Sequence, residues 1–141
     1  MMQAIYSEMQ IKPLRDELTN AGFSQITEVD AVEETINTKG FVIYVINSVC
    51  CCAANNARPA AVQALDMAKT KGLYVKGITS FAGVDIQAVN KFRELTSDYQ
   101  PSSPCIGLFK DGRLLTVVER KNIEKSTVPE VLSRITPFFD K

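Results

Sequence analysis

The stretch Asn47-Ser48-Val49-Cys50-Cys51-Cys52-Ala53-Ala54-Asn55-Asn56-Ala57-Arg58-Pro59 holds three of the four cysteines of the chain. The apolar run Phe41–Ile46 before it has the length and the β-branched and aromatic content of a buried strand, and the alanine-rich segment after it predicts a helix. The first N–H groups of a helix lack intrahelical partners and favour a negative charge. A thiol at this junction therefore has a stabilised thiolate, which is the nucleophilic form of cysteine.

Length, composition and charge favour a single compact domain over residues 1–141. The chain is 45% hydrophobic, and its 16 basic and 16 acidic residues balance, so its charge favours neither nucleic acid nor a membrane surface as a partner. Its apolar runs are shorter than the ~20 residues of a membrane span, and Met1–Glu8 lacks the features of a secretion signal. We expect a soluble cytoplasmic protein, in which clustered cysteines are catalytic, redox-sensing or metal-binding rather than structural disulfides.

Apolar spacing and turn signals predict the other elements. Strands are expected at 41–46, 73–78, 105–109 and 113–118, and helices at 11–20, from about 27 to 38, from 60 to 69, 85–96 and 127–138. A helix separates the first two strands, so they should be parallel. Asp111-Gly112 between apolar runs indicates an antiparallel hairpin. Residues 119–125 are predicted to form a solvated loop.

This order of elements is that of an α/β, thioredoxin-like domain: a central mixed β-sheet flanked by helices, with an N-terminal helical extension. Two further features favour this fold. A cysteine cluster follows the first core strand, and Ser103-Pro104 precedes the hairpin, where thioredoxin-like proteins keep a cis-proline beside the active cysteine.

The sequence also resembles the bacilliredoxin family of thioredoxin-like proteins, whose active motif is Cys-X-Cys. The matching stretches are Glu17–Phe23, Asn47–Cys50, Cys52–Ala54, Ala57–Ala60, Phe81–Gly83, Pro101–Pro104 and Leu108–Gly112. The resemblance implies a thiol–disulfide oxidoreductase that takes bacillithiol, or a similar small thiol, from mixed disulfides of client proteins. In this scheme Cys50 attacks, and Cys52 or a second bacillithiol resolves.

The resemblance further implies the partners. They are client proteins with S-thiolated cysteines, a low-molecular-weight thiol as co-substrate in place of a bound cofactor, and a reductase for recycling. Disulfide isomerisation is a second expected activity, and a homodimer is left open. The chain departs from the family pattern at Cys51, often a glycine, and at Cys105, where a serine or another small residue is expected. It also contains no histidine.

The spacing of the three cysteines limits how they can pair. Adjacent residues have Cα atoms near ~3.8 Å apart, whereas a disulfide needs roughly 4.4–6.8 Å, so only Cys50 and Cys52 should pair. The ring they close is small, and a strained disulfide is easily reduced. We predict that Cys50 is the outermost thiol and the nucleophile and that Cys52 is the resolving thiol. Without a histidine or a lysine in the motif, the helix N-terminus must lower the pKa of Cys50.

The accessory residues each have two interpretations. Cys51 is either a small substitute for glycine or an alternative resolving thiol, and Cys105 is either a buried strand residue or a secondary redox group. Pro104 is expected to follow Ser103 through a cis bond. Arg58 is either a solvated helix residue or a partner of a carboxylate in the malate part of bacillithiol. Asn55, with its neighbour Asn56, either lines the site or belongs to the surface.

Two rival functions compete with the redox interpretation. The first is a metal or iron–sulfur site built from Cys50, Cys51, Cys52 and Cys105, although three consecutive cysteines lack the usual zinc-ligand spacing and we predict no metal. The second is an inactive thioredoxin-like adaptor, which predicts that replacing Cys50 by serine changes nothing in a mixed-disulfide assay.

Overall fold

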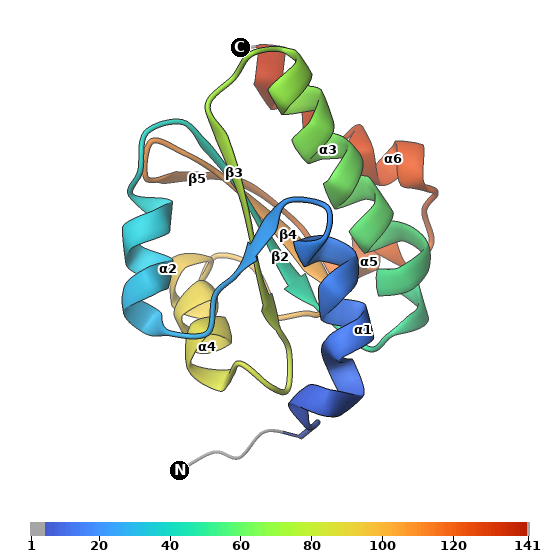
Figure 1. Ribbon diagram of the computed structural model, residues 1–141. Helices are drawn as coiled ribbons and strands as arrows, with labels where there is room; N and C mark the ends of the chain where they lie inside the picture. The colour runs from blue at the N-terminus through green and yellow to red at the C-terminus, as the bar shows by residue number, and fades with distance from the viewer. Residues whose placement is uncertain (1–4, 141) are drawn as a thin grey trace.

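The computed structural model describes residues 5–140, so the parts of the sequence predictions that concern residues 1–4 and 141 lie outside the described chain. Its centre is a five-stranded mixed sheet in the order β1-β3-β2-β4-β5 (Figure 1). The strands are β1 Phe23–Gln25, β2 Phe41–Asn47, β3 Val75–Phe81, β4 Cys105–Lys110 and β5 Arg113–Val118. β2 is parallel to β3 and antiparallel to β4. The predicted mixed thioredoxin-like sheet is confirmed.

The helices cover both faces of this sheet. They are α1 Glu8–Thr19, α2 Val29–Ile36, α3 Arg58–Thr70, α4 Ile86–Leu95, α5 Arg120–Ile123 and α6 Val128–Leu132, with a π-helical turn η1 at Ala53–Ala57 and a 3-10 turn η2 at Thr136–Asp140. In Figure 1, α2 and α4 lie on one side of the sheet and α1, α3 and α6 on the other. The predicted N-terminal helical extension is α1, which packs beside α3.

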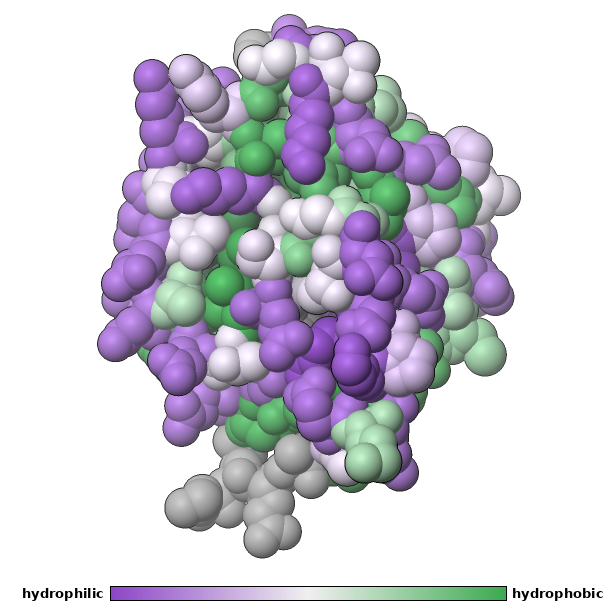
Figure 2. Space-filling view, in the orientation of Figure 1, coloured by the Kyte–Doolittle hydropathy of each residue, from purple (hydrophilic) through white to green (hydrophobic). Residues whose placement is uncertain are grey.

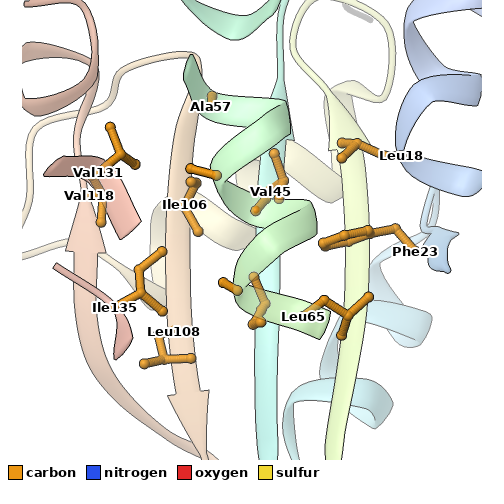
Figure 3. Packing of buried hydrophobic residues seen from close by; sticks show 14 of the residues in the cluster. Leu18, Phe23, Val45, Ala57, Leu65, Ile106, Leu108, Val118, Val131 and Ile135 are labelled. Carbon is orange, nitrogen blue, oxygen red and sulfur yellow. The ribbon is translucent and has the colours of Figure 1, made fainter. Parts of the chain in front are cut away.

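Two separate hydrophobic cores lie on the two faces of the sheet. Alternate residues of β2 point to opposite faces, so Val45 joins the core under α1, α3 and α6 while Ile46 joins the core under α2 and α4. Figure 3 shows the first core, in which alanines of α3 allow this helix to lie close to the sheet. On the face shown in Figure 2, hydrophilic side chains surround smaller hydrophobic areas. Among residues 5–140, no helix is long and apolar enough to cross a membrane.

The sequence analysis missed β1, a three-residue strand that pairs in parallel with β3. Its Phe23 lies opposite Gly77, and a Cβ at position 77 would meet the Phe23 ring at 2.7 Å. Glycine at 77 therefore makes room for this aromatic ring. So short a strand carries too few residues for an alternating pattern to stand out.

The C-terminal prediction was partly wrong. Thr127 and Glu130 form the predicted capping box, but α6 ends at Leu132 and the chain continues into the 3-10 turn η2 instead of one helix to 138. Arg134 and Ile135 already bond to the carbonyls three residues before them, and Pro137 has no N–H with which to resume the α-helical pattern. The predicted loop at 119–125 contains the short helix α5.

Candidate active site

The cysteines follow the C-terminal end of β2, in a turn held by side chains of the same segment. The amide oxygen of Asn47 accepts the N–H of Ser48 at 2.8 Å, and the Ser48 hydroxyl accepts the N–H of Cys50 at 3.2 Å. The N–H of Ala53 then donates to the carbonyl of Cys50 at 3.0 Å. These bonds turn the chain directly into η1, a π-helical turn of the kind often found at functional sites.

The three thiols differ in exposure. Cys51 is exposed, Cys50 is half-buried and Cys52 is 8% exposed, so the prediction that Cys50 is the outermost thiol was wrong. The sulfurs of Cys50 and Cys52 are 2.6 Å apart, and all four cysteines are free. A covalent disulfide has sulfurs ~2.05 Å apart, so the pairing of Cys50 with Cys52 requires little movement.

The surroundings of Cys50 favour its thiolate. The thiol of Cys52 has the largest effect in lowering the pKa of Cys50, and the N–H groups of Cys52 and Ala53 and the charge of Arg120 lower it further, while partial burial opposes them. The N–H groups predicted from the sequence therefore help to lower the pKa of Cys50, but their effect is smaller than that of the Cys52 thiol. Arg120, which the sequence placed in a solvated loop, is thus a charge near the site that the sequence analysis missed.

The surroundings of Cys52 have the opposite effect. Burial raises the pKa of Cys52 to about 11, and the nearby sulfur of Cys50 raises it as well. When the pair shares one proton, Cys52 is therefore the thiol that holds it, and it can donate that proton in a hydrogen bond to Cys50. This asymmetry fits Cys50 as the attacking sulfur and Cys52 as the thiol that acts second.

We expect the rate of alkylation of Cys50 by iodoacetamide to rise with pH along a titration curve. The midpoint of this curve should lie below the pKa of an ordinary thiol, about 8.5. A lowered pKa populates the thiolate at lower pH, so the whole curve moves toward acid. Peptide mass mapping resolves Cys50, and the unfolded chain is the control. Replacing Cys52 by alanine should move the midpoint upward. Equal midpoints in folded and unfolded protein would contradict this activation.

The proline loop lies next to this site. The Ser103–Pro104 bond is cis, as predicted from the sequence. The Ser102 hydroxyl accepts the N–H of Arg120 at 3.1 Å, and the Ser103 carbonyl accepts from Nη1 of Arg120 at 3.4 Å. The loop thereby fixes the start of α5.

Cys105 lies on the other face of the sheet. It is 1% exposed and packs in the core under α2 and α4, whereas Cys52 packs in the core under α3. Burial raises the pKa of Cys105 to about 11, and Nη1 of Arg93 lies 3.6 Å from its sulfur. The structure thus gives Cys105 the place of a small buried strand residue and does not bring it to the cysteine triplet. Among residues 5–140, no group of three or more histidine, cysteine, aspartate or glutamate side chains is placed to hold a metal ion.

The surroundings of Arg58 differ from the prediction of a solvated helix residue. Arg58 is 2% exposed rather than solvated, and Nη1 donates to the Asn47 side-chain oxygen at 2.9 Å and to the Ser48 carbonyl at 3.2 Å. Nη2 forms an ion pair with Glu17 of α1 at 3.1 Å. Arg58 therefore braces the segment that leads to the cysteines against the N-terminal helix.

The two asparagines of η1 have different surroundings. Asn55 is exposed, which fits the surface interpretation. Asn56 donates from Nδ2 to the carbonyls of Ile123 at 2.9 Å and Ser126 at 2.8 Å. Asn56 thus ties the cysteine turn to α5, so the helix that carries Arg120 is held at both ends.

A half-buried thiol with a lowered pKa beside a second thiol, after a core strand of this sheet and near a cis-proline, defines a thioredoxin-like thiol–disulfide oxidoreductase. Solved structures support the fold. A thioredoxin from Malassezia sympodialis superimposes with a TM-score of 0.60 at 13% identity, covering 84% of this chain and 94% of that one. Thioredoxin O2 from Arabidopsis thaliana gives 0.56 at 11% identity, covering 85% and 96%.

Sequence comparison gives the family. Residues 6–141 match the family described as Disulphide isomerase. A bacilliredoxin from Cytophaga hutchinsonii is 43% identical over 137 residues, covering 97% of this chain and 99% of that protein. One from Staphylococcus epidermidis is 37% identical over 137 residues, covering 97% and 92%. The chain belongs to the bacilliredoxin family.

Proposed function

We propose that this protein removes bacillithiol, or a similar low-molecular-weight thiol, from mixed disulfides of client proteins. The observation that carries the proposal is the pair of sulfurs 2.6 Å apart, one of which is half-buried with a lowered pKa and the other buried with a raised pKa. Such a pair suits two successive exchange steps, in which one thiol attacks first and the second resolves.

In the first step the Cys50 thiolate attacks the small-thiol sulfur of the mixed disulfide. One S–S bond breaks and one forms, the client cysteine leaves as a thiolate, and the small thiol is joined to Cys50. The negative charge on Cys50 is now gone, and with it an influence that raised the pKa of Cys52. Cys52 then ionises more readily, attacks Cys50 and expels the small thiol as a thiolate.

The product of the second step is a Cys50–Cys52 disulfide, which a reductase must reduce with two electrons before the next cycle. A second molecule of the small thiol offers another route, because it can exchange with the adduct on Cys50. The same attack on a disulfide within a client supports disulfide isomerisation as a further activity. We place this cycle in the cytoplasm, where reducing partners keep thiols available.

The test is a Cys52→Ser variant mixed with an S-thiolated client in the absence of reductant. We expect one equivalent of small thiol to accumulate on Cys50, seen as an added mass on its peptide, together with a freed client thiol. The Cys51→Ser variant is the control and, like the native protein, should release the small thiol once and end with a Cys50–Cys52 disulfide. Recovery of the client still thiolated would contradict the proposal, and a covalent client–protein adduct would favour isomerisation instead.

A further inference from the structure

We infer that Arg120 forms a carboxylate-binding subsite that makes the enzyme prefer small thiols bearing carboxylates. This inference rests on the proposed function, since it concerns the thiol that becomes joined to Cys50. That thiol must lie within its own short length of the Cys50 sulfur. A positive charge held at this position can therefore select among thiols by their charge.

The first argument is where Arg120 is held. Its backbone N–H and its Nη1 atom bind the serines that precede cis Pro104, at 3.1 and 3.4 Å. At the other end of α5, Asn56 from the cysteine turn binds the Ile123 carbonyl, and Ile123 packs in the same core as Cys52. The guanidinium is thus bound to the proline loop, and the helix that carries it is bound to the cysteine turn.

The second argument is that Arg120 is available to a ligand. Its side chain is 46% exposed, and its Nε atom forms an ion pair with Glu124 at 3.2 Å. The hydrogen bonds among residues 5–140 use Nε and Nη1 of this guanidinium and leave Nη2 for a ligand. Ile46 of β2 pairs with Cys105, so the proline loop that binds Arg120 lies opposite the end of β2 that leads to the cysteines. Glu124 first, and the sulfurs of Cys50 and Cys52 next, raise the pKa of Arg120, which agrees with this position.

The third argument excludes the other arginine near the motif. Arg58 was a candidate for a carboxylate partner, but its side chain is 3% exposed and already binds Glu17, Asn47 and Ser48. Its remaining donor, Nε, is buried away from solvent. A carboxylate could reach Arg58 only by displacing Glu17, whereas it can approach Arg120 from solvent.

The experiment compares two mixed disulfides of one uncharged peptide, made with mercaptosuccinate, which has two carboxylates, and with 2-mercaptoethanol, which has none. We measure kcat/KM for peptide release and take the ratio of the two substrates within each variant. Arg120→Gln is expected to lower this ratio about tenfold, the loss of one exposed charge-assisted contact. Lys121→Gln removes a neighbouring charge and should keep the ratio, and Arg120→Lys should keep part of it.

Three outcomes would overturn the inference. If Arg120→Gln slows both substrates equally, Arg120 only activates Cys50. If Lys121→Gln lowers the ratio as much, the preference is a general surface effect that salt would screen. In both cases thiol removal by the native protein still stands. If the native protein releases neither peptide, the proposed function fails and the inference fails with it.

Discussion

Replacing Cys50 by serine is expected to lower the rate of thiol removal by at least ~10³-fold, the scale of loss when a catalytic nucleophile is removed. The Cys50 sulfur is the one whose pKa is lowered by the Cys52 thiol, by N–H groups and by Arg120. A serine hydroxyl in the same turn would keep the shape of the site, but it would not ionise near neutral pH. The measurement is release of the small thiol from a thiolated client under excess reductant.

The neighbouring cysteines provide matched controls for this prediction. Cys51→Ser should stay within about twofold of the native rate, because its exposed side chain can be replaced without cavity or clash. Cys105→Ser tests a thiol on the opposite face of the sheet and should leave the chemistry intact. Full activity of the Cys50→Ser variant would instead show a different nucleophile, and no activity in either protein would support an adaptor without redox chemistry.

The sheet and most helices could be predicted because their signals are local. β2 is a continuous apolar run, and the hairpin between β4 and β5 has Asp111 and Gly112 at positive φ, as its Asp-Gly turn requires. β1 has three residues, too few for an alternating strand pattern to be recognised. The N-cap of α5 is Glu119, not the serine or threonine of a typical capping box. The only sequence sign of α5 was the pairing of Glu119 with Asn122, a weak form of the capping box.

The candidate site was only partly predictable for a different reason. The sequence predicts attack by Cys50 and resolution by Cys52, and the opposite directions of their two pKa shifts fit this prediction. The surroundings of the arginines depend on distant segments, because Arg58 pairs with Glu17 of α1 and Arg120 bonds to the proline loop. In an alanine-rich helix or a charged loop, such residues look solvated until the fold brings their partners together. The exposure order of Cys50 and Cys51 likewise follows from the backbone turn and not from composition.

Replacing Asp85 by alanine is expected to lower the free energy of unfolding by about 3 kcal/mol, the low end of the cost of breaking a buried ion pair. Asp85 is 6% exposed. Its carboxylate accepts hydrogen bonds from Nη1 of Arg15 at 2.8 Å, from Nη2 of Arg15 at 3.1 Å and from the N–H of Phe81 at 2.8 Å. Without it, Glu8 is the one ion-pair partner that residues 5–140 leave to the buried Arg15 guanidinium, and its side chain is largely exposed. The Phe81 N–H also loses its acceptor. Since Arg15 belongs to α1 and Asp85 follows β3, this pair fastens the N-terminal helix to the sheet.

Urea unfolding of matched variants checks this role. Asp16→Ala removes an exposed ion pair with Lys12 on the same helix and should change stability by no more than about 0.5 kcal/mol. Replacing Arg15 by methionine together with Asp85→Ala should lose less than the sum of the single changes, because no buried charge is then left without its partner. If Asp85→Ala unfolds at the native urea midpoint, or if the double variant loses the full sum, α1 is held by its apolar contacts alone and the buried pair contributes no net stability.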